Sequence, residues 1–314
     1  MNQPLVSIII NNYNYGRYLS SAIDSALEQT YLNTEIIVVD DGSTDNSREI
    51  IESYGDKIKP TLKPNGGHAS ALNAGFAVSQ GEIICFLDSD DMFSPSKVQE
   101  IVKAFTTFKD IDWVFHPLFY VKTGEIEKGD FFSLVERESQ DINYVKIDFR
   151  NQLRAGKQPE FVPQTSALSF SRRVLEKIFP IPEDRKTYVG DTYMSMGCVF
   201  ISKGCVIDKK MSIYRLHDNN AYSSIQLNKS LETFAKLRIA TGYWLRTNFP
   251  GLSKYTNTFF SKGLACFWLI ENTDLHNRKF IRDYFSNLSI LEKVLVLIKS
   301  LYYFQKTLLY KTLP

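Results

Sequence analysis

The sequence predicts an α/β fold, in which a Rossmann-like mixed sheet is flanked by helices and followed by a C-terminal helical region. Over residues 6–121, short apolar strand patterns alternate with amphipathic helix patterns, and polar loops follow the strands. Over residues 224–314, the periodicity is helical and proline is almost absent. Ligands bind at the carboxyl ends of the strands in open α/β sheets, so we expect the functional site in these polar loops.

Composition excludes several classes of protein. The 314 residues suit one large α/β domain with an appendage, or two domains. The 37 Lys and Arg residues nearly balance the 35 Asp and Glu residues, and the net charge of +2 gives no indication of nucleic-acid binding. The four cysteines include no C-x-x-C pair, which predicts buried, reduced thiols.

Membrane-spanning and exported proteins are also disfavoured. No apolar stretch reaches the roughly 18 to 20 residues that cross a bilayer. The apolar run at residues 5–10 is too short for a signal peptide and follows no positive region. We therefore expect a cytoplasmic protein, either soluble or bound peripherally at the inner face of the membrane.

The first units of the chain each consist of a strand, a polar loop and a helix. A buried strand over 6–10 leads into a polar loop that holds Asn11 and Tyr13, and a helix over 18–29 follows. A second strand over 35–39 leads into an acidic loop that holds Asp41. A strand, a helix and a strand in so few residues predict a right-handed parallel unit.

A glycine pair precedes the third helix. After a helix over 48–54 and a strand over 58–62, Gly66 and Gly67 open a helix that holds Asn73 and ends near Val78. Free N–H groups at such a helix start suit an anion or a ribose hydroxyl. The pair is equally consistent with a plain turn.

Four residues after the next strand hold the strongest chemical pattern. Residues 83–87 form an apolar run without alternation, which predicts a central strand covered on both faces. Asp88 and Asp90 follow it and project to the same side of an extended chain. Paired carboxylates suit Mg²⁺ or Mn²⁺, above all a metal shared with substrate phosphates. By itself, the pattern is also that of an acidic turn in which an Asp caps the next helix.

The middle of the chain continues the alternation less regularly. Ser94 and Pro95 predict an N-cap and a first-turn proline for a helix that includes Val98 to Phe105, and residues 112–121 predict one strand. Residues 122–160 predict a variable insertion with apolar patches such as Phe131 and Phe132. Residues 163–171 predict another strand, and 173–178 a short helix.

Two further polar residues stand at element ends. Asp191 opens an apolar helix that extends to residue 201, where the helix dipole favours the ionised carboxylate, and a plain N-cap explains it equally well. His217 follows a last strand predicted over 206–214, and on its own it is an ordinary loop histidine.

The C-terminal tail is amphipathic and basic. Its apolar residues fall largely on one helical face, and four lysines (Lys293, Lys299, Lys306 and Lys311) accompany one acidic residue, Glu292. Such a helix lies on anionic membranes, and an apolar stripe of this kind equally predicts packing on the catalytic domain or a homodimer contact.

Taken together, the motifs resemble the inverting glycosyltransferases of family two, whose catalytic domain has the GT-A fold. The resemblance covers about residues 6–223, with 224–314 as the helical region. It is carried by V-S-I-I-I-N-N-Y-N, I-I-V-V-D-D-G-S-T-D, N-G-G with A-L-N-A-G, G-E-I-I-C-F-L-D-S-D-D, the G-D at 190–191 and Y-R-L-H-D-N-N-A-Y-S. It implies a nucleoside-diphosphate sugar donor, a glycan or lipid-linked acceptor, and Mn²⁺ or Mg²⁺.

The resemblance also implies residue roles. It places the nucleotide at Asn11, Tyr13, Asp41, Gly67, Asn73 and Asp88, the metal at Asp90, Asp88 and His217, and the general base at Asp191. Within this group Tyr13 would stack on the nucleobase and Asp41 would accept its imide N–H.

Three departures accompany the resemblance. Leu72 replaces a frequent arginine, Gly190 a frequent acidic residue, and Asn11 a frequent threonine or proline. The first leaves the donor pocket short of one cation. One alternative is a nucleotide-sugar or glycan binding protein without activity, which the intact set of acidic residues disfavours. Another is a receiver-like signalling domain, but this chain has a second acidic cluster and a long C-terminal half, which such a domain lacks.

Overall fold

The computed structural model describes residues 3–126, 142–183, 189–218, 220, 227–270 and 275–312. Its main sheet has the strand order β3-β2-β1-β4-β9-β6-β10-β8. The strands are β1 (Val6–Asn12), β2 (Thr34–Asp40), β3 (Lys59–Leu62), β4 (Ile83–Asp88), β6 (Trp113–Phe115), β8 (Tyr144–Ile147), β9 (Leu168–Ser171) and β10 (Gly204–Ile207). β4 is therefore central, as predicted. The sheet is mixed, because β9 runs antiparallel to both β4 and β6.

A smaller sheet lies beside it, with the order β5-β11-β7. Its strands are β5 (Met92–Phe93), β7 (Phe119–Lys122) and β11 (Ser212–Leu216). β5 begins one residue after the acidic turn, and β11 ends one residue before His217. This second sheet therefore joins two segments that are far apart in the sequence.

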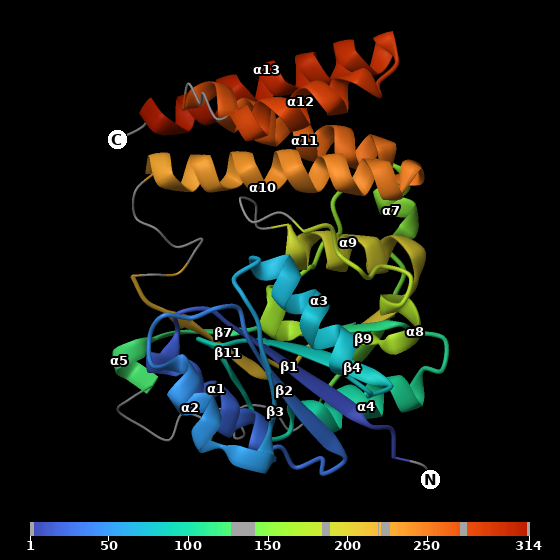
Figure 1. Ribbon diagram of the computed structural model, residues 1–314. Helices are drawn as coiled ribbons and strands as arrows, with labels where there is room; N and C mark the ends of the chain where they lie inside the picture. The colour runs from blue at the N-terminus through green and yellow to red at the C-terminus, as the bar shows by residue number, and fades with distance from the viewer. Residues whose placement is uncertain are drawn as a thin grey trace.

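Helices cover both faces of the main sheet (Figure 1). They are α1 (Gly16–Leu27), α2 (Ser47–Ser53), α3 (His68–Val78), α4 (Lys97–Thr107), α8 (Arg172–Leu175) and α9 (Gly190–Ile201), with short 3₁₀ segments η1 (Gly55–Lys57) and η2 (Thr165–Ala167). Two further helices lie elsewhere: α5 (Thr123–Ile126) packs beside β7 of the small sheet, and α7 (Arg150–Arg154) packs beside α9. Ile8 of β1 packs in the same core cluster as Leu19 of α1 and Val98 of α4. Its neighbour Ile9 faces the opposite cluster, with Met194 of α9. The alternation of side chains along each strand thus places two apolar cores on the two faces.

Four helices form a separate layer beyond α9 (Figure 1). They are α10 (Leu227–Asn248), α11 (Ser253–Leu269), α12 (Leu275–Ser286) and α13 (Ile290–Thr312), and the 3₁₀ segment η3 (Pro250–Leu252) joins the first two. The predicted helical region is confirmed. Residues of this layer, such as Phe260 and Val296, belong to the same core cluster as Ile9 of the sheet. The expected boundary at residue 223 lies outside the described residues.

Glu35 connects three parts of the sheet. Its carboxylate accepts the Ser7 hydroxyl at 2.5 Å, the Lys59 ammonium at 2.6 Å and the N–H groups of Gln80 at 2.5 Å and Gly81 at 3.0 Å. Burial alone would raise the pKa of Glu35, but the hydrogen bonds from Lys59, Ser7 and Gln80 lower it below its ordinary value. This carboxylate fixes the start of β4 beside β1 and β2.

Two predicted strands are each divided between the two sheets. Residues 112–121 form β6 in the main sheet and β7 in the small one, and His116, Pro117 and Leu118 separate them. Residues 206–214 likewise span the end of β10 and the start of β11. Pro117 has no N–H for a ladder, so the chain can leave one sheet there and join another. The prediction of a single strand was wrong in both places.

Two smaller predictions also need correction. α4 begins at Lys97 rather than after Ser94, and its N-cap position is Ser96. Residues 163–171 form η2 before β9 rather than one strand. Of the predicted insertion at 122–160, residues 127–141, with Phe131 and Phe132, lie outside the described residues. Its end supplies β8, which pairs antiparallel with β10.

The state of the cysteines agrees with the prediction from the sequence. All four cysteines are free and buried. Within the described residues, no helix has both the length and the apolar character needed to cross a bilayer.

Candidate functional site

The acidic turn follows directly from the end of β4. The register of the parallel strands places Asn11, near the end of β1, opposite Asp88. Asn11 Nδ2 donates to Asp88 Oδ1 at 3.0 Å. Asn11 Oδ1 is buried and accepts no hydrogen bond from the described residues. The turn thus begins with a carboxylate that is held in place and an amide oxygen that can accept a further donor.

Asp90 faces the loop after β11. His217 Nε2 lies 3.0 Å from Asp90 Oδ2, and the Tyr18 ring lies 4.8 Å from the imidazole between centroids. The guanidinium of Arg215 donates from Nε to the Asp90 carbonyl at 2.7 Å. The structure therefore brings Asp90 and His217 together, although 219 and 221–223 of the associated motif lie outside the described residues.

Asp91 is the buried residue at the end of the acidic turn. Its carboxylate is buried and accepts the Ser166 hydroxyl at 2.6 Å and the Arg215 N–H at 3.0 Å. Ser166 Oγ also accepts the Asp88 N–H at 3.1 Å, and its carbonyl accepts the buried Lys97 ammonium at 2.8 Å. Sequence reasoning missed Ser166 because a small serine in a polar segment carries no distinguishing pattern.

Asp191 approaches the same site from α9. It is the second residue of the helix, and the N-cap position is Val189. Its Oδ1 accepts the N–H of Thr192 at 2.6 Å, so it is not the N-cap that the sequence left open. Its negative charge is among those that raise the pKa of Asp88, after burial and the charge of Asp90.

His68 lies between these groups. At the start of α3, its Nε2 is 3.9 Å from Asp88 Oδ1. A Cβ added at Gly190 would be 2.7 Å from His68 Nδ1 and 3.0 Å from Leu72 Cδ1. Two of the three departures from the family pattern, Leu72 and Gly190, therefore lie beside each other, and the absent side chain makes room for His68.

Asp41 builds the loop before α3. Its carboxylate accepts Lys63 Nζ at 2.5 Å, the Gly66 N–H at 2.9 Å and the Gly67 N–H at 2.7 Å. Gly67 has φ +88°, which residues with a Cβ rarely adopt. Three donors leave this carboxylate about one acceptor position of the roughly four it has. The predicted hydrogen bond from a base to Asp41 has room only there.

Tyr13 and Asn73, both predicted to bind the nucleotide, have different surroundings. Tyr13 is 46% exposed in the loop after β1, where its ring is accessible. Asn73 instead holds residues 181–183, because its amide donates to the Ile181 carbonyl at 2.8 Å and accepts the Ile181 N–H at 2.8 Å. In this arrangement Asn73 positions the segment that leads towards Asp191.

The chemistry of the turn suits a divalent cation. Burial raises the pKa of Asp88 to about 6; His68 opposes the rise, and the charges of Asp90 and Asp191 add to it. The carboxylates thus form a concentration of negative charge with hard oxygen ligands. No group of three His, Cys, Asp or Glu side chains within the described residues is arranged to hold a metal. The protein would supply only part of a coordination sphere, as is common for Mg²⁺ shared with phosphates.

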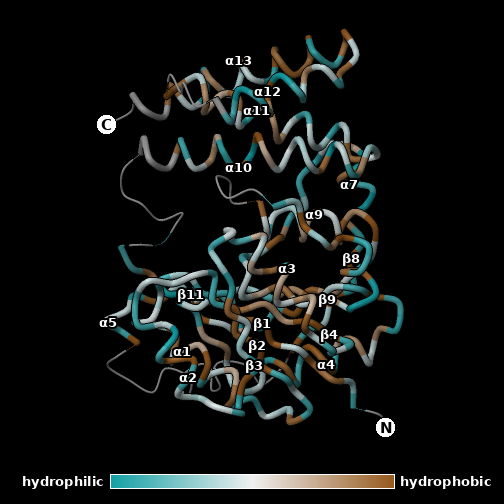
Figure 2. The backbone as a smooth tube through the Cα atoms, viewed as in Figure 1, coloured by the Kyte–Doolittle hydropathy of each residue, from teal (hydrophilic) through white to brown (hydrophobic). Residues whose placement is uncertain are grey.

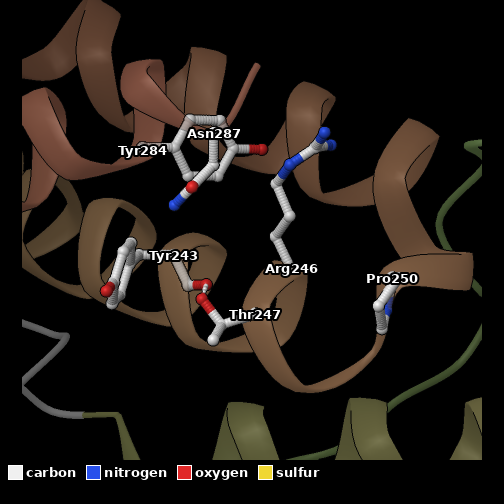
Figure 3. Close-up of a pocket in the computed structure, with 6 residues that line it drawn as sticks. All are labelled: Tyr243, Arg246, Thr247, Pro250, Tyr284 and Asn287. Atoms are coloured by element: carbon white, nitrogen blue, oxygen red, sulfur yellow. Dashed lines mark hydrogen bonds between the residues drawn. The ribbon is translucent and has the colours of Figure 1, made fainter. Parts of the chain in front are cut away.

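A separate pocket lies in the helical layer (Figure 3). It measures about 330 Å³ and is lined by Tyr243, Arg246, Thr247, Pro250, Tyr284 and Asn287. Arg246 pairs with Glu292 at 2.8 Å, which neutralises its charge. We assign this pocket no part in the site.

Comparisons with known proteins agree with this site. Glycosyl transferase family 2 matches residues 7–179. The glycosyltransferase alr2836 of Nostoc sp. is 39% identical over 223 residues, which are 70% of this chain and 67% of that protein.

Two solved structures share the fold. TarS of S. aureus, in complex with UDP-GlcNAc, has a TM-score of 0.61 at 16% identity over 96% of this chain and 89% of its own. The mannosyltransferase PcManGT of Pyrobaculum calidifontis, in complex with GDP-Man and Mn²⁺, has a TM-score of 0.51 at 15% identity over 100% of this chain and 89% of its own. The GT-A fold predicted from the sequence is therefore confirmed, and the chain is a glycosyltransferase that belongs to glycosyl transferase family 2.

Proposed function

We propose that the chain is an inverting, metal-dependent transferase that moves a sugar from a nucleoside-diphosphate donor to a hydroxyl of a glycan or lipid-linked glycan. One observation carries the proposal. The start of α9, which holds Asp191, borders the end of β4: His68 Nε2 lies 3.9 Å from Asp88 Oδ1, and Gly190, the residue before Asp191, lies against the same imidazole. A base and a cluster of metal-type ligands in one site suit a single in-line displacement at the anomeric carbon.

Each group then has a role. Asp191 removes the proton of the acceptor hydroxyl as that oxygen attacks, and a positioned base of this kind contributes roughly 10²- to 10⁴-fold. Asp88 and Asp90 would hold the metal, and His217, whose Nε2 lies 3.0 Å from Asp90 Oδ2, orients the Asp90 carboxylate. A bound Mg²⁺ or Mn²⁺ supplies neutralisation of the charge on the diphosphate leaving group. The Mn²⁺ in the PcManGT complex supports this choice.

The donor's nucleoside occupies the loops after β1 and β2. Tyr13 offers an exposed ring for stacking, Asn11 Oδ1 offers an acceptor, and the Gly67 loop is held in shape by Asp41. Nothing in these contacts distinguishes one base from another, so the donor is defined here only as a nucleoside-diphosphate sugar.

The test begins with a panel of nucleotide sugars, assayed for hydrolysis and transfer with Mn²⁺ and with Mg²⁺. With the active donor, Asp191→Asn should bind donor near the wild-type affinity and lose transfer by about 10²- to 10⁴-fold. NMR of the product should show an inverted anomeric centre.

Asp148→Asn is the matched control. Asp148, like Asp191, accepts a backbone N–H at the start of a helix, from Arg150 at 3.1 Å. Its substitution should leave transfer unchanged. Retained transfer in Asp191→Asn would reduce that residue to a structural one, and donor binding without any turnover by the wild type would instead support a binding protein.

A further inference from the structure

The outer face of α13 is apolar. Along Ile290–Thr312, Ile290 is 82% exposed, Leu291 is 69% exposed and Leu309 is 65% exposed. The remaining exposed large apolar residues of this helix are Val294, Leu295, Leu297, Ile298, Leu301, Tyr302 and Leu308. From Ile290 to Tyr302 they repeat at spacings of three and four residues, and Leu308 and Leu309 lie on the same side of the helix beyond the exposed Gln305.

The inner face of α13 is held by the buried Val296, by the Phe304 ring against Trp268 and by polar contacts. Glu292 accepts Arg246 at 2.8 Å, and Lys299 Nζ donates to Thr258 Oγ1 at 2.8 Å. The Ser261 hydroxyl donates to the Val296 carbonyl at 3.1 Å. Figure 1 shows α13 on the far side of the helical layer from the sheet, and Figure 2 shows hydrophobic residues recurring along it. The helix thus docks on α10 and α11 and presents its most apolar face outward.

The last two helices, α12 and α13, carry a net positive charge. The described residues 275–312 carry seven Lys and Arg against two Asp and Glu, a net charge of +5 in a chain whose total is +2. Arg278, Lys279 and Lys306 are exposed. A second copy of the chain would bring the same positive charge against this face and be repelled. An anionic surface is complementary to it.

We propose that the outer face of α13 binds the surface of an anionic phospholipid bilayer, with the helix lying flat in the interface. A helix of 23 residues is about 34 Å long at 1.5 Å per residue. It presents an apolar face of the kind that enters the headgroup and acyl boundary, with basic residues nearby for the lipid headgroups. Membrane binding by α13 does not depend on which acceptor the enzyme uses.

Sedimentation of the full chain with lipid vesicles tests this. The wild type should bind vesicles of phosphatidylcholine with phosphatidylserine more tightly than phosphatidylcholine alone, and high salt should weaken the binding. The triple variant Leu291→Ser, Ile298→Ser and Leu301→Ser should lose binding. Leu32→Ser, at an apolar residue 87% exposed elsewhere, should keep it.

Charge is tested separately. Arg278→Gln, Lys279→Gln and Lys306→Gln should each lower the partition coefficient on anionic vesicles about fivefold, since one basic residue near such a surface contributes about 1 kcal/mol. The fold of every variant is checked by its donor binding.

Three results would overturn the proposal. One is no binding of the wild type to anionic vesicles. Another is equal binding by the triple variant. The third is a dimer in the absence of lipid that the triple variant abolishes, because a second copy would then cover the face.

Discussion

Removal of the Ser166 hydroxyl should loosen the acidic turn without replacing any residue that is assigned to substrate or metal. Ser166 is fully buried, donates to Asp91 Oδ2 at 2.6 Å and accepts the Asp88 N–H at 3.1 Å. Ser166→Ala leaves both partners without this bond. A buried donor or acceptor left without a partner costs about 1–3 kcal/mol, so with two such groups we expect the free energy of unfolding to fall by about 2–6 kcal/mol.

A second effect should appear at the site. The hydroxyl fixes Asp88 and Asp91 on either side of Asp90, and its loss should weaken metal-dependent binding of the donor nucleotide. Uridine and guanosine diphosphates, titrated calorimetrically with and without Mn²⁺, separate this from a general loss of fold. The affinity with Mn²⁺ should fall, and the affinity without it should change little.

Ser300→Ala is the matched control. Ser300 is also fully buried, but its hydroxyl makes one bond, to the Val296 carbonyl of its own helix at 2.7 Å. We expect a loss of about 1 kcal/mol on urea unfolding and no change in nucleotide binding. If Ser166→Ala matched Ser300→Ala in both measurements, the hydroxyl would not position the turn.

Three further predictions follow from other contacts. Glu35→Gln should lower the free energy of unfolding by about 1–3 kcal/mol at neutral pH. The pKa of Glu35 is depressed in the folded state, so its contribution to stability is present above the unfolded pKa near 4.3 and is lost as the pH falls through the folded pKa. The urea unfolding curves of variant and wild type should therefore converge at low pH. Gly190→Ala should push on His68 and reduce transfer about fivefold or more, for an overpacking cost of about 1–3 kcal/mol. Gly124→Ala, in open space, should leave transfer unchanged. Asp90→Ala should abolish metal-dependent donor binding and keep the wild-type unfolding curve; unchanged metal dependence would disprove its assignment.

Much of the catalytic fold could be predicted because its first strands are buried on both faces. Continuous apolar runs such as 83–87 distinguish such strands from the amphipathic helices between them. The change of sheet within residues 112–121 and 206–214 was missed because both ends of each segment are β-favouring, although the polar run Asp208, Lys209, Lys210 interrupts the second. Pro117 was the available signal in the first.

Helix α13 shows a second limit of prediction from the sequence. Its amphipathic pattern predicted a face for packing or for a membrane, and both remained open from the sequence. Only the structure shows that Glu292 and Lys299 face inward while Leu291 and Ile298 face outward. Periodicity identifies the two faces of a helix but does not say which one its neighbours cover.

The site itself depends on the small sheet that the sequence did not predict. β5 follows Asp91 and pairs antiparallel with β11, with Ile213 opposite Met92. This pairing brings the Arg215 N–H to the Asp91 carboxylate and carries His217 to Asp90. Each acidic residue could be identified from its motif, but the distances among them are set by strands of two to five residues, which have too little pattern to be recognised. Substitutions that weaken β5 or β11 should therefore affect metal-dependent binding before they affect the main sheet.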